Sequence, residues 1–421
     1  MNSSKPFDIQ DVNLITLAIP IFFILILCEY LYGVIAKNNT YRLNDAFSSI
    51  SLGMISRLPV ILNLGILWGL TYNFIVKDFN LGIFQNDHWT TWAVAFLLYD
   101  LSYYWMHRLS HEIKILWASH VVHHQSEEYN LSTALRQTGT GFLFTSIFYI
   151  PMILLGIPLK IFITVAAINL IYQFWVHTEH IKKIGFIELV FVTPSHHRVH
   201  HAQNPEYVDT NHGGVFIIWD KLFGTFVEER SDLKPIYGTV KPLRSWNPIW
   251  ANFEIFHQMF KDAIYTKKIT DKIKLWFSAT GWRPDDVVKR FPSQVNDLTA
   301  FKKYDPAITK EIRIFAFLQF LIINVISTAI IFTLNDQTYT EKLIFAVILI
   351  LSVTSISMLL ENIKGSYGLE FARSIVVVAL FFTNILEPDL LASKIILAQG
   401  LFNIICIAFL IPIKRQFQMN D

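Results

Sequence analysis

The sequence has only two cysteines and few charged residues. Cys28 and Cys406 lie in apolar segments at opposite ends of the chain, so neither a disulfide framework nor a thiolate metal site is available. Charged residues make up 16% of the chain, against roughly 25% in an ordinary soluble domain. The net charge is +2, and no run of lysine and arginine alternates with stacking aromatic residues. We therefore expect no nucleic-acid partner.

Long hydrophobic segments dominate what is present. Hydrophobic residues make up 53% of the 421 residues, and the mean hydropathy is +0.40. A membrane-spanning helix needs roughly 20 mostly apolar residues. The sequence therefore predicts an all-α, multi-span integral membrane protein. Its apolar segments are Val12–Ala36, Ser51–Val76, Trp89–Met106, Gly141–Val176, Ile312–Leu334, Leu343–Leu360, Phe371–Leu386 and Leu390–Ile411.

Two of these segments carry further information. Val12–Ala36 lacks a basic start and a small-residue cleavage site, so it is expected to be a retained helix and not a signal peptide. Gly141–Val176 is interrupted by Pro151, Gly156 and Pro158. We interpret it as a helical hairpin that enters and leaves the membrane on the same side.

The distribution of positive charge predicts the orientation, because short cytoplasmic loops carry an excess of lysine and arginine. Lys37 and Arg42 follow the first segment, and Lys414 and Arg415 follow the last. Between the hairpin and the later segments, residues 178–310 are polar and contain 19 of the 35 lysines and arginines. We expect these residues to form a cytoplasmic cap, with the N-terminus on the outer side.

The same pattern divides the chain into two parts. Residues 1–311 would form a membrane-embedded catalytic part with its cap, and residues 312–421 would form C-terminal transmembrane helices. The membrane is expected to be a bacterial inner membrane or the endoplasmic reticulum.

Histidines form the clearest chemical pattern. Most of the 14 histidines lie between His107 and His201. Residues three or four apart share one face of a helix. The groups with this spacing are HRLSH (His107, His111), HVVHH (His120, His123, His124) and HRVHH (His197, His200, His201), and QFWVHTEH places His177 at the end of the hairpin. The predicted topology brings all of these residues to the cytoplasmic edge of the membrane.

This number of histidines exceeds what one metal ion can use, so the pattern predicts a two-metal site. Imidazole without thiolate suits iron, zinc, copper or nickel, whereas zinc alone would be satisfied by three or four ligands. We prefer two iron ions, because open positions on an all-imidazole pair can bind O₂. Two alternatives stay open: histidine as a mere polar residue of amphipathic helices, and a zinc-binding or metal-transport protein.

Other histidines are weaker candidates. His177 and His180 are alternatives, and we favour His177 because it directly ends the apolar segment. His196 points about 100° away from His197 on a helix, so it is expected to support a ligand without binding the metal. Surface or hydrogen-bonding roles are expected for the isolated histidines, which are His88, His212 and His257.

Two carboxylates stand near the first histidine motif. Asp100 lies two helical turns before it, and we expect this carboxylate to accept the second N–H of a ligating imidazole. Glu112 directly follows the motif, where a solvated surface position is an equally good interpretation.

The three histidine motifs resemble those of the fatty acid hydroxylase and sterol desaturase superfamily, whose signature is HxxxH, HxxHH and HxxHH. Within that superfamily, further stretches are similar to the alkylglycerol monooxygenases, which cleave ether lipids. These stretches are SEEYNLSTALRQ (Ser126–Gln137), YQFWVHTE (Tyr172–Glu179), TPSHHRVHH (Thr193–His201) and GGVFIIWDKLFGTF (Gly213–Phe226). The resemblance extends from about Asp100 to Glu228. Within its last stretch, we expect Trp219, Asp220 and the FGTF turn to close the structure under the metal site.

The resemblance implies a specific reaction. An ether-bearing carbon of an alkylglycerol would be hydroxylated with O₂, and the product would fall apart to a fatty aldehyde and glycerol. The reductant would be tetrahydrobiopterin, or alternatively a redox donor protein. The two iron ions would be held by His107, His111, His120, His123, His124, His177, His197, His200 and His201.

Two rival functions remain at this point. A sterol or fatty-acyl hydroxylase or desaturase would use the same metal site on another lipid. A non-catalytic membrane metal carrier would instead need ligands along a path through the spans, whereas these ligands gather at one edge.

Overall fold

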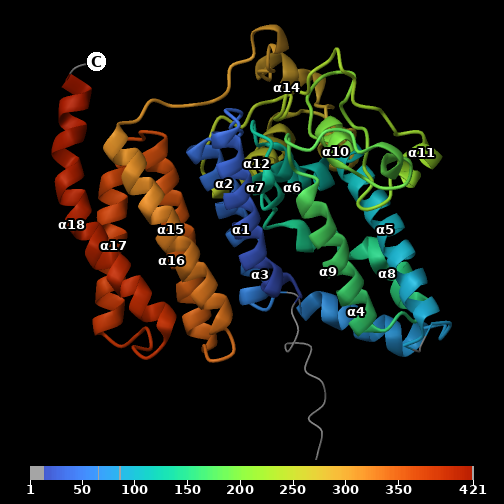
Figure 1. Cartoon of the computed structure of the whole chain (residues 1–421), viewed down its shortest axis with the longest axis horizontal. Helices are drawn as coiled ribbons and strands as arrows, with labels where there is room; N and C mark the ends of the chain where they lie inside the picture. Colours follow the sequence, from blue (N-terminus) through green and yellow to red (C-terminus); the bar gives the residue numbers. More distant parts are fainter. Residues whose placement is uncertain (1–13, 65, 85–86, 420–421) are drawn as a thin grey trace, which may run out of the picture.

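The computed structural model describes residues 14–64, 66–84 and 87–419, and these residues form helices and loops without a strand (Figure 1). The predicted all-α fold is confirmed. The longer helices are α1 (Leu14–Ile35), α2 (Leu43–Ile55), α4 (Ile66–Phe79), α5 (Trp89–Glu112), α6 (Lys114–His124), α9 (Leu159–Trp175), α12 (Pro248–Tyr265), α15 (Lys310–Phe332), α16 (Tyr339–Leu360), α17 (Ser366–Phe382) and α18 (Leu391–Met419). The shorter helices are α3 (Leu58–Ile61), α7 (Leu131–Ala134), α8 (Ile150–Leu154), α10 (Pro194–His200), α11 (Ile218–Phe223), α13 (Ile269–Phe277) and α14 (Asp285–Arg290).

Four helices of the described part are long and apolar enough to cross a membrane. They contain the segments Leu17–Ile35, Lys310–Phe332, Tyr339–Leu360 and Leu391–Leu410, which belong to α1, α15, α16 and α18. The protein is therefore a multi-pass membrane protein. α17 packs against α16 and α18 to complete a C-terminal bundle of four helices (Figure 1).

The predicted single span Ser51–Val76 is wrong. α2 ends at Ile55, the short helix α3 carries Pro59 in its first turn, and α4 begins only at Ile66. Proline lacks the backbone N–H that would continue the preceding helix, and Asn63 adopts a left-handed conformation with φ of 54°. The apolar composition of this segment conceals a double break in the helix.

The predicted hairpin Gly141–Val176 is half correct. Its second arm is the continuous helix α9. Its first arm is a series of 3₁₀ turns followed by the five-residue helix α8. The chain reverses at Gly156, whose φ of +87° suits glycine, and α9 then returns towards the cap (Figure 1).

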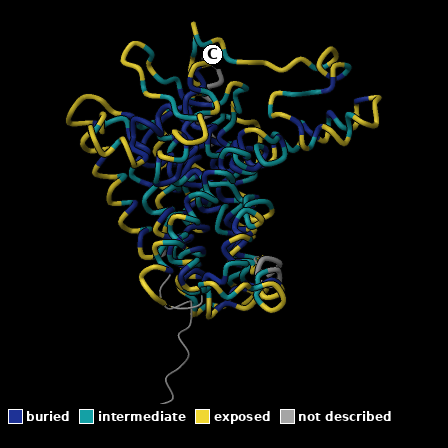
Figure 2. Tube along the Cα trace, turned by 90° about the vertical axis from the view of Figure 1, so that its right-hand side faces the viewer, coloured by how far each residue is buried: buried dark blue, intermediate teal, exposed yellow. Residues whose placement is uncertain are grey.

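The start of α1 and the end of α18 lie where the predicted topology places them relative to the cap. α1 begins at the end of the molecule away from the cap, and α18 ends at the same end as the cap (Figure 1). The N-terminal residues 1–13 lie outside the described residues. Which side of the membrane the cap faces stays a prediction. Figure 2 shows that buried residues concentrate where the cap meets the helices.

Candidate metal centre

Four segments bring the nine predicted histidines together beneath the cap. The last two turns of α5 carry His107 and His111, and α6 carries His120, His123 and His124. His177 follows the end of α9, and α10 presents His197, His200 and His201 at its C-terminal end. A residue from another segment fixes the start of α6. The Lys114 backbone N–H donates to the Ser278 carbonyl at 2.9 Å, an ordinary length for an N–H···O hydrogen bond.

The nine side chains form two separate groups. Within each group, one nitrogen of every imidazole lies within 4.8 Å of the corresponding nitrogens of the others. Group A contains His107, His111, His120, His124 and His200, and group B contains His123, His177, His197 and His201. Two groups of this size match the two-metal arrangement that the motifs predict, although their role as ligands stays a prediction.

Backbone carbonyls fix the tautomer of several imidazoles. A carbonyl only accepts hydrogen bonds, so each ring nitrogen that contacts one must be the donor. His123 Nδ1 donates to the Arg136 carbonyl at 3.0 Å, and His177 Nδ1 donates to the Gln173 carbonyl at 2.8 Å. In group A, the corresponding carbonyl partners are His212 for His107 and Thr210 for His200, each at 2.8 Å. The Nε2 atoms of these rings are therefore lone-pair acceptors.

In group B, Nε2 atoms lie at the spacing that a metal ion requires. In group B, Nε2 atoms are 3.2 Å apart for His123 and His177, and 3.0 Å apart for His177 and His197. The Nδ1 atoms of His123 and His177 are both protonated, so these two neutral rings have no hydrogen to place between their Nε2 atoms. Two nitrogens bound at about 2.1 Å to one ion, 90° apart, would be about 3.0 Å from each other. The donor set therefore fits a metal ion in group B.

Group A shows the same spacing. His124 Nε2 is 3.2 Å from His111 Nε2 and 3.1 Å from His120 Nε2. The Nε2 atoms of His107 and His200 are buried without a hydrogen-bond partner among the described residues. Buried polar atoms are rarely left without a partner, so these nitrogens also fit a metal ligand role.

Burial keeps the cluster neutral. Burial lowers the pKa of His197, His200 and His201 well below the usual value of 6.5, and the neighbouring imidazoles lower it further. Neutral imidazole is the form that binds metal ions. The site is therefore prepared for metal without having to lose protons at neutral pH.

The remaining histidines lie outside both groups. His180 packs against Tyr32 with a ring distance of 5.0 Å, and His196 packs against Phe226 at 5.5 Å. His257 is exposed on α12, where it contacts Trp250. His88 is exposed and accepts a hydrogen bond from the first turn of α5. Of the two alternatives after α9, His177 is the one that the structure brings to a group.

His212 is a site residue that the sequence did not reveal. It is 1% exposed, its ring lies 5.0 Å from that of His111, and its carbonyl accepts the His107 Nδ1–H. The expected hydrogen-bonding role is confirmed, because His212 Nε2 also donates to the Asp209 carbonyl at 3.1 Å, whereas a surface position is wrong. Its place directly before Gly213 and Gly214 is the only sequence signal of this role.

The expected role of Asp100 is wrong. Among the described residues its carboxylate bonds to no histidine and instead accepts hydrogen bonds from the Val215 N–H at 2.8 Å, the Phe216 N–H at 3.0 Å and the Trp219 indole at 2.9 Å. Two helical turns correspond to about 11 Å along the axis, which is beyond the reach of this short side chain. Glu112 pairs with Arg108 at 2.8 Å on the exposed face of α5, as the solvated interpretation expects.

The GGVFIIWDKLFGTF stretch closes the structure under group A. The Asp220 carboxylate accepts hydrogen bonds from the backbone N–H groups of His212 at 2.7 Å and Gly213 at 2.8 Å. Burial raises the pKa of Asp220 to about 6. A Cβ atom on Gly214 would lie 2.8 Å from Tyr103, so only glycine lets this loop approach α5 so closely. The stretch thereby holds the His212 carbonyl against His107.

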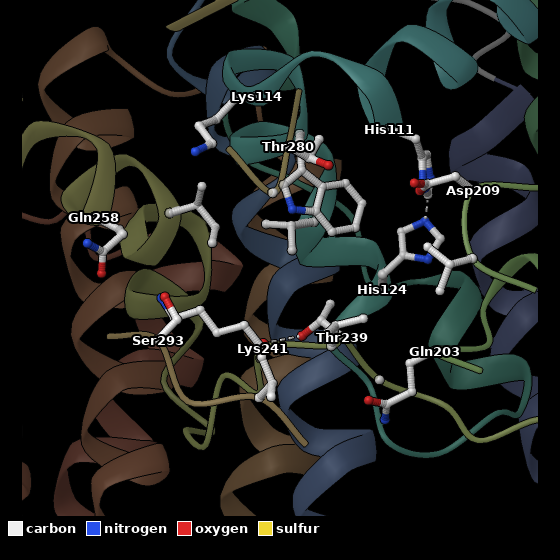
Figure 3. Close-up of a pocket in the computed structure, with 18 of the residues that line it drawn as sticks. His111, Lys114, His124, Gln203, Asp209, Thr239, Lys241, Gln258, Thr280 and Ser293 are labelled. Atoms are coloured by element: carbon white, nitrogen blue, oxygen red, sulfur yellow. Dashed lines mark hydrogen bonds and ion pairs between the residues drawn. The ribbon is translucent and has the colours of Figure 1, made fainter. Parts of the chain in front are cut away.

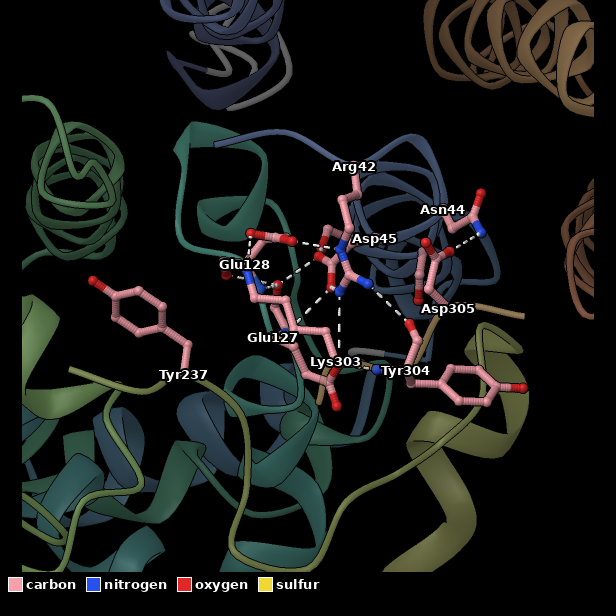
Figure 4. A network of polar contacts seen from close by, with 12 residues as sticks. Arg42, Asn44, Asp45, Glu127, Glu128, Tyr237, Lys303, Tyr304 and Asp305 are labelled. Carbon is pink, nitrogen blue, oxygen red and sulfur yellow. Dashed lines mark hydrogen bonds and ion pairs between the residues drawn. The ribbon is translucent and has the colours of Figure 1, made fainter. Parts of the chain in front are cut away.

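The SEEYN loop is held by an ionic network at the cap end of α2 (Figure 4). Arg42 forms ion pairs with Glu127 at 3.6 Å and with Glu128. Lys303 also pairs with Glu128, at 2.5 Å, and Asp45 accepts a hydrogen bond from the Glu127 backbone N–H at 3.3 Å. The SEEYN loop directly follows α6, which carries histidines of both groups. The network therefore joins this loop to the linker that precedes the C-terminal bundle.

A cavity of about 360 Å³ opens beside group A (Figure 3). Its apolar lining includes Trp117, whose ring lies 5.0 Å from that of His111, and Met259 of α12. Polar side chains line the part away from the histidines, among them Lys114 and Gln258 (Figure 3). Burial lowers the pKa of Lys114 to about 8. The cavity therefore offers both apolar contact and hydrogen-bonding groups next to the candidate metal site.

A second, smaller cavity reaches group A from the side of α5. It measures about 30 Å³, is lined by His120, and includes Met106, Phe144 and Phe148. The 3₁₀ turns after residue 140 form its outer wall, so the irregular first arm of the hairpin lies directly beside the histidines.

Comparison with known proteins agrees with this site. The fatty acid hydroxylase family model matches residues 92–225, which contain all nine histidines. An alkylglycerol monooxygenase of Danio rerio is 37% identical over 375 residues, covering 88% of this chain and 83% of the relative. That of Homo sapiens is 35% identical over 403 residues, covering 93% and 87%. An ornithine lipid hydroxylase of Rhizobium tropici is 32% identical over 142 residues, covering 32% and 43%. No solved structure matches the chain.

The chain therefore belongs to the fatty acid hydroxylase superfamily of oxidoreductases. Within it, the long matches place the chain in the alkylglycerol monooxygenase family, and the protein is a lipid monooxygenase associated with the membrane.

Proposed function

We propose that this protein is a di-iron monooxygenase that hydroxylates the ether-bearing carbon of alkylglycerols. The observation that carries the proposal is the pair of histidine groups, in which neighbouring Nε2 atoms lie 3.0 to 3.2 Å apart, beside a cavity of about 360 Å³. The substrate class is supported by the long matches to alkylglycerol monooxygenases.

The chain's own residues would hold and orient the metals. Five imidazoles of group A and four of group B would each hold one iron ion, and the bound pair would activate O₂ for insertion of one oxygen atom into a C–H bond. Carbonyl groups that accept the Nδ1–H atoms keep the rings in the metal-binding tautomer and orientation. Burial of the cluster excludes bulk water from the reacting atoms.

The large cavity would position the substrate. The alkyl chain would contact its apolar lining, which includes Trp117 and Met259, and the glycerol hydroxyls would bond to polar groups such as Gln258 and Lys114. This arrangement would bring the carbon beside the ether oxygen next to group A. The hydroxylated product is a hemiacetal, in which the C–O bond to glycerol breaks to give a fatty aldehyde and free glycerol.

The reaction needs an electron donor. One O₂, two electrons and two protons give the hydroxylated lipid and one water. We propose tetrahydrobiopterin as the donor, with a redox partner protein as the alternative, on the basis of the family resemblance. We further propose that the cap and both histidine groups face the cytoplasm, and that residues 1–311 act as the catalytic part while residues 312–421 anchor it.

A lipid panel with purified, iron-loaded protein in nanodiscs tests the assignment. With O₂ and a reduced pterin, an alkylglycerol should yield fatty aldehyde by mass spectrometry, with one atom of ¹⁸O₂ incorporated. His201→Ala should abolish the product, whereas His257→Ala, a matched change of an exposed histidine, should retain it. Oxidation of sterols or acyl lipids without any aldehyde from alkylglycerols would reject the substrate and leave the metal centre standing.

Replacing the reductant separates the two donors. Activity that needs a reduced ferredoxin-type protein, and that a reduced pterin does not support, would reject the pterin. Metal analysis that finds one ion or none in folded protein would reject the two-metal centre itself.

A further inference from the structure

A cavity of about 90 Å³ that no histidine lines lies between α1, α2 and α15. Ile15 and Ile19 of α1 line one wall, and Asn324 and Thr328 of α15 line another. α1 begins and α15 ends at the end of the molecule away from the cap (Figure 1). The parts of α1 and α15 that line the cavity therefore lie towards the end away from the cap, where the N-terminal helices meet the C-terminal bundle. On the cap side its lining ends at Leu135 and Gln137, which flank Arg136, the carbonyl partner of His123.

Of the described residues that line this cavity, Arg57 alone carries a charge. It follows the end of α2 and is partly exposed. Within the described residues, its guanidinium has no ion pair and no hydrogen bond to a protein acceptor. Two neighbouring polar side chains donate within their own helix, Asn324 to the Phe320 carbonyl at 2.7 Å and Thr328 to the Asn324 carbonyl at 2.8 Å. A cation in apolar surroundings is costly without an anionic partner.

The cavity lies along the first half of α1. Its lining residues on α1 extend from Ile15 to Phe23, which is about 12 Å along the helix. This is less than half of a hydrocarbon core roughly 30 Å thick, measured from the end away from the cap. A long arginine side chain at this depth can reach the interface while its stem remains in apolar surroundings.

We propose that this cavity binds the phosphate group of a phospholipid from the leaflet opposite the histidine groups. The Arg57 guanidinium donates to the phosphate oxygens, a geometry that suits its planar fork of N–H groups. The acyl chains lie against the exposed apolar surfaces beside the cavity, which include Leu17 and Ile21 of α1 and Val325 of α15. The lipid joins the N-terminal helices to the C-terminal bundle, and this role is separate from oxidation of the substrate.

Native mass spectrometry of the full-length protein with added phosphatidylglycerol tests the site. Arg57→Gln should weaken retention about tenfold or more, because a hydrogen bond to a charged group contributes at least 1.4 kcal/mol, or about tenfold. Arg57→Lys should restore part of the retention. Thr328→Phe, which fills the cavity without changing any charge, should also lower it.

Two controls make the result specific. Arg313→Gln removes an exposed cation at the other end of α15 and should leave retention unchanged. Diacylglycerol with the same chains but no phosphate should not be retained. Equal retention by the wild type and by folded Arg57→Gln and Thr328→Phe variants would overturn the proposal. An equal fall with Arg313→Gln, or equal retention of diacylglycerol, would also overturn it, because binding would then not depend on the phosphate and Arg57.

Discussion

Removal of the His177 imidazole tests the two-metal assignment most directly, because the two histidine groups differ in size. Group B has four imidazoles and group A has five, so His177→Ala leaves three in group B and all five in group A. Loss of a residue that only supports a ligand already costs 10- to 100-fold in metal affinity. Loss of a direct ligand should cost at least about 100-fold, or about 2.8 kcal/mol. We expect the metal content to fall from about two ions per chain to about one.

The assay is metal analysis by mass spectrometry after a chelator wash, with activity measured on the same samples. His180→Ala provides the matched control, because His180 lies three residues further on, packs against Tyr32 and belongs to neither group. It should keep both ions and most of the activity. If His177→Ala kept two ions and full activity, or if both variants lost metal equally, group B would not be a metal site.

Three further predictions concern pH, the bundle and topology. Burial lowers the pKa of Lys114 from 10.5 to about 8, so the cost of burying its charge is complete below pH 8 and disappears by pH 10.5. Wild-type protein should therefore gain melting temperature relative to Lys114→Met between these pH values, and a constant difference would contradict this. Glu370→Leu should destabilise the bundle by about 3–5 kcal/mol, because it leaves Arg373 buried without its ion-pair partner. The double variant Glu370→Leu, Arg373→Leu should be destabilised less, as measured by thermal unfolding. Single cysteines at positions 5 and 420 should be labelled from opposite sides of the membrane, and labelling from the same side would refute the predicted topology.

The sequence predicts helices well where an apolar run is uninterrupted. The expected segments Ile312–Leu334 and Leu343–Leu360 correspond to α15 and α16 within a few residues. The failures occur where local breaks override composition, as in Ser51–Val76, which Pro59 and Asn63 divide. Hydropathy averages over a window and does not register a missing N–H or a left-handed residue.

The candidate site was likewise predicted in part from the sequence. Helical spacing places the histidines of one motif on one face, so the motifs of α5, α6 and α10 were visible without the structure. Asp100 and His212 were misjudged because their partners lie more than 100 residues away, at Val215 and His107 respectively. Such pairings arise from the packing of loops on helices, and spacing along the chain carries no signal of them.

The hydrogen bonds around the histidines explain how a cap with little regular structure keeps a defined geometry. Between residues 201 and 247 the structure contains one short helix, α11. The carbonyls of Thr210 and His212 nevertheless lie in this loop and accept Nδ1–H groups from His200 and His107. The Nε2 atoms of His107 and His200 are buried without a hydrogen-bond partner among the described residues, so a bound metal ion would stabilise these imidazoles and, through the two carbonyls, the loop. Metal removal should therefore loosen the cap before it affects the membrane helices, since α15 to α18 pack through apolar contacts of their own.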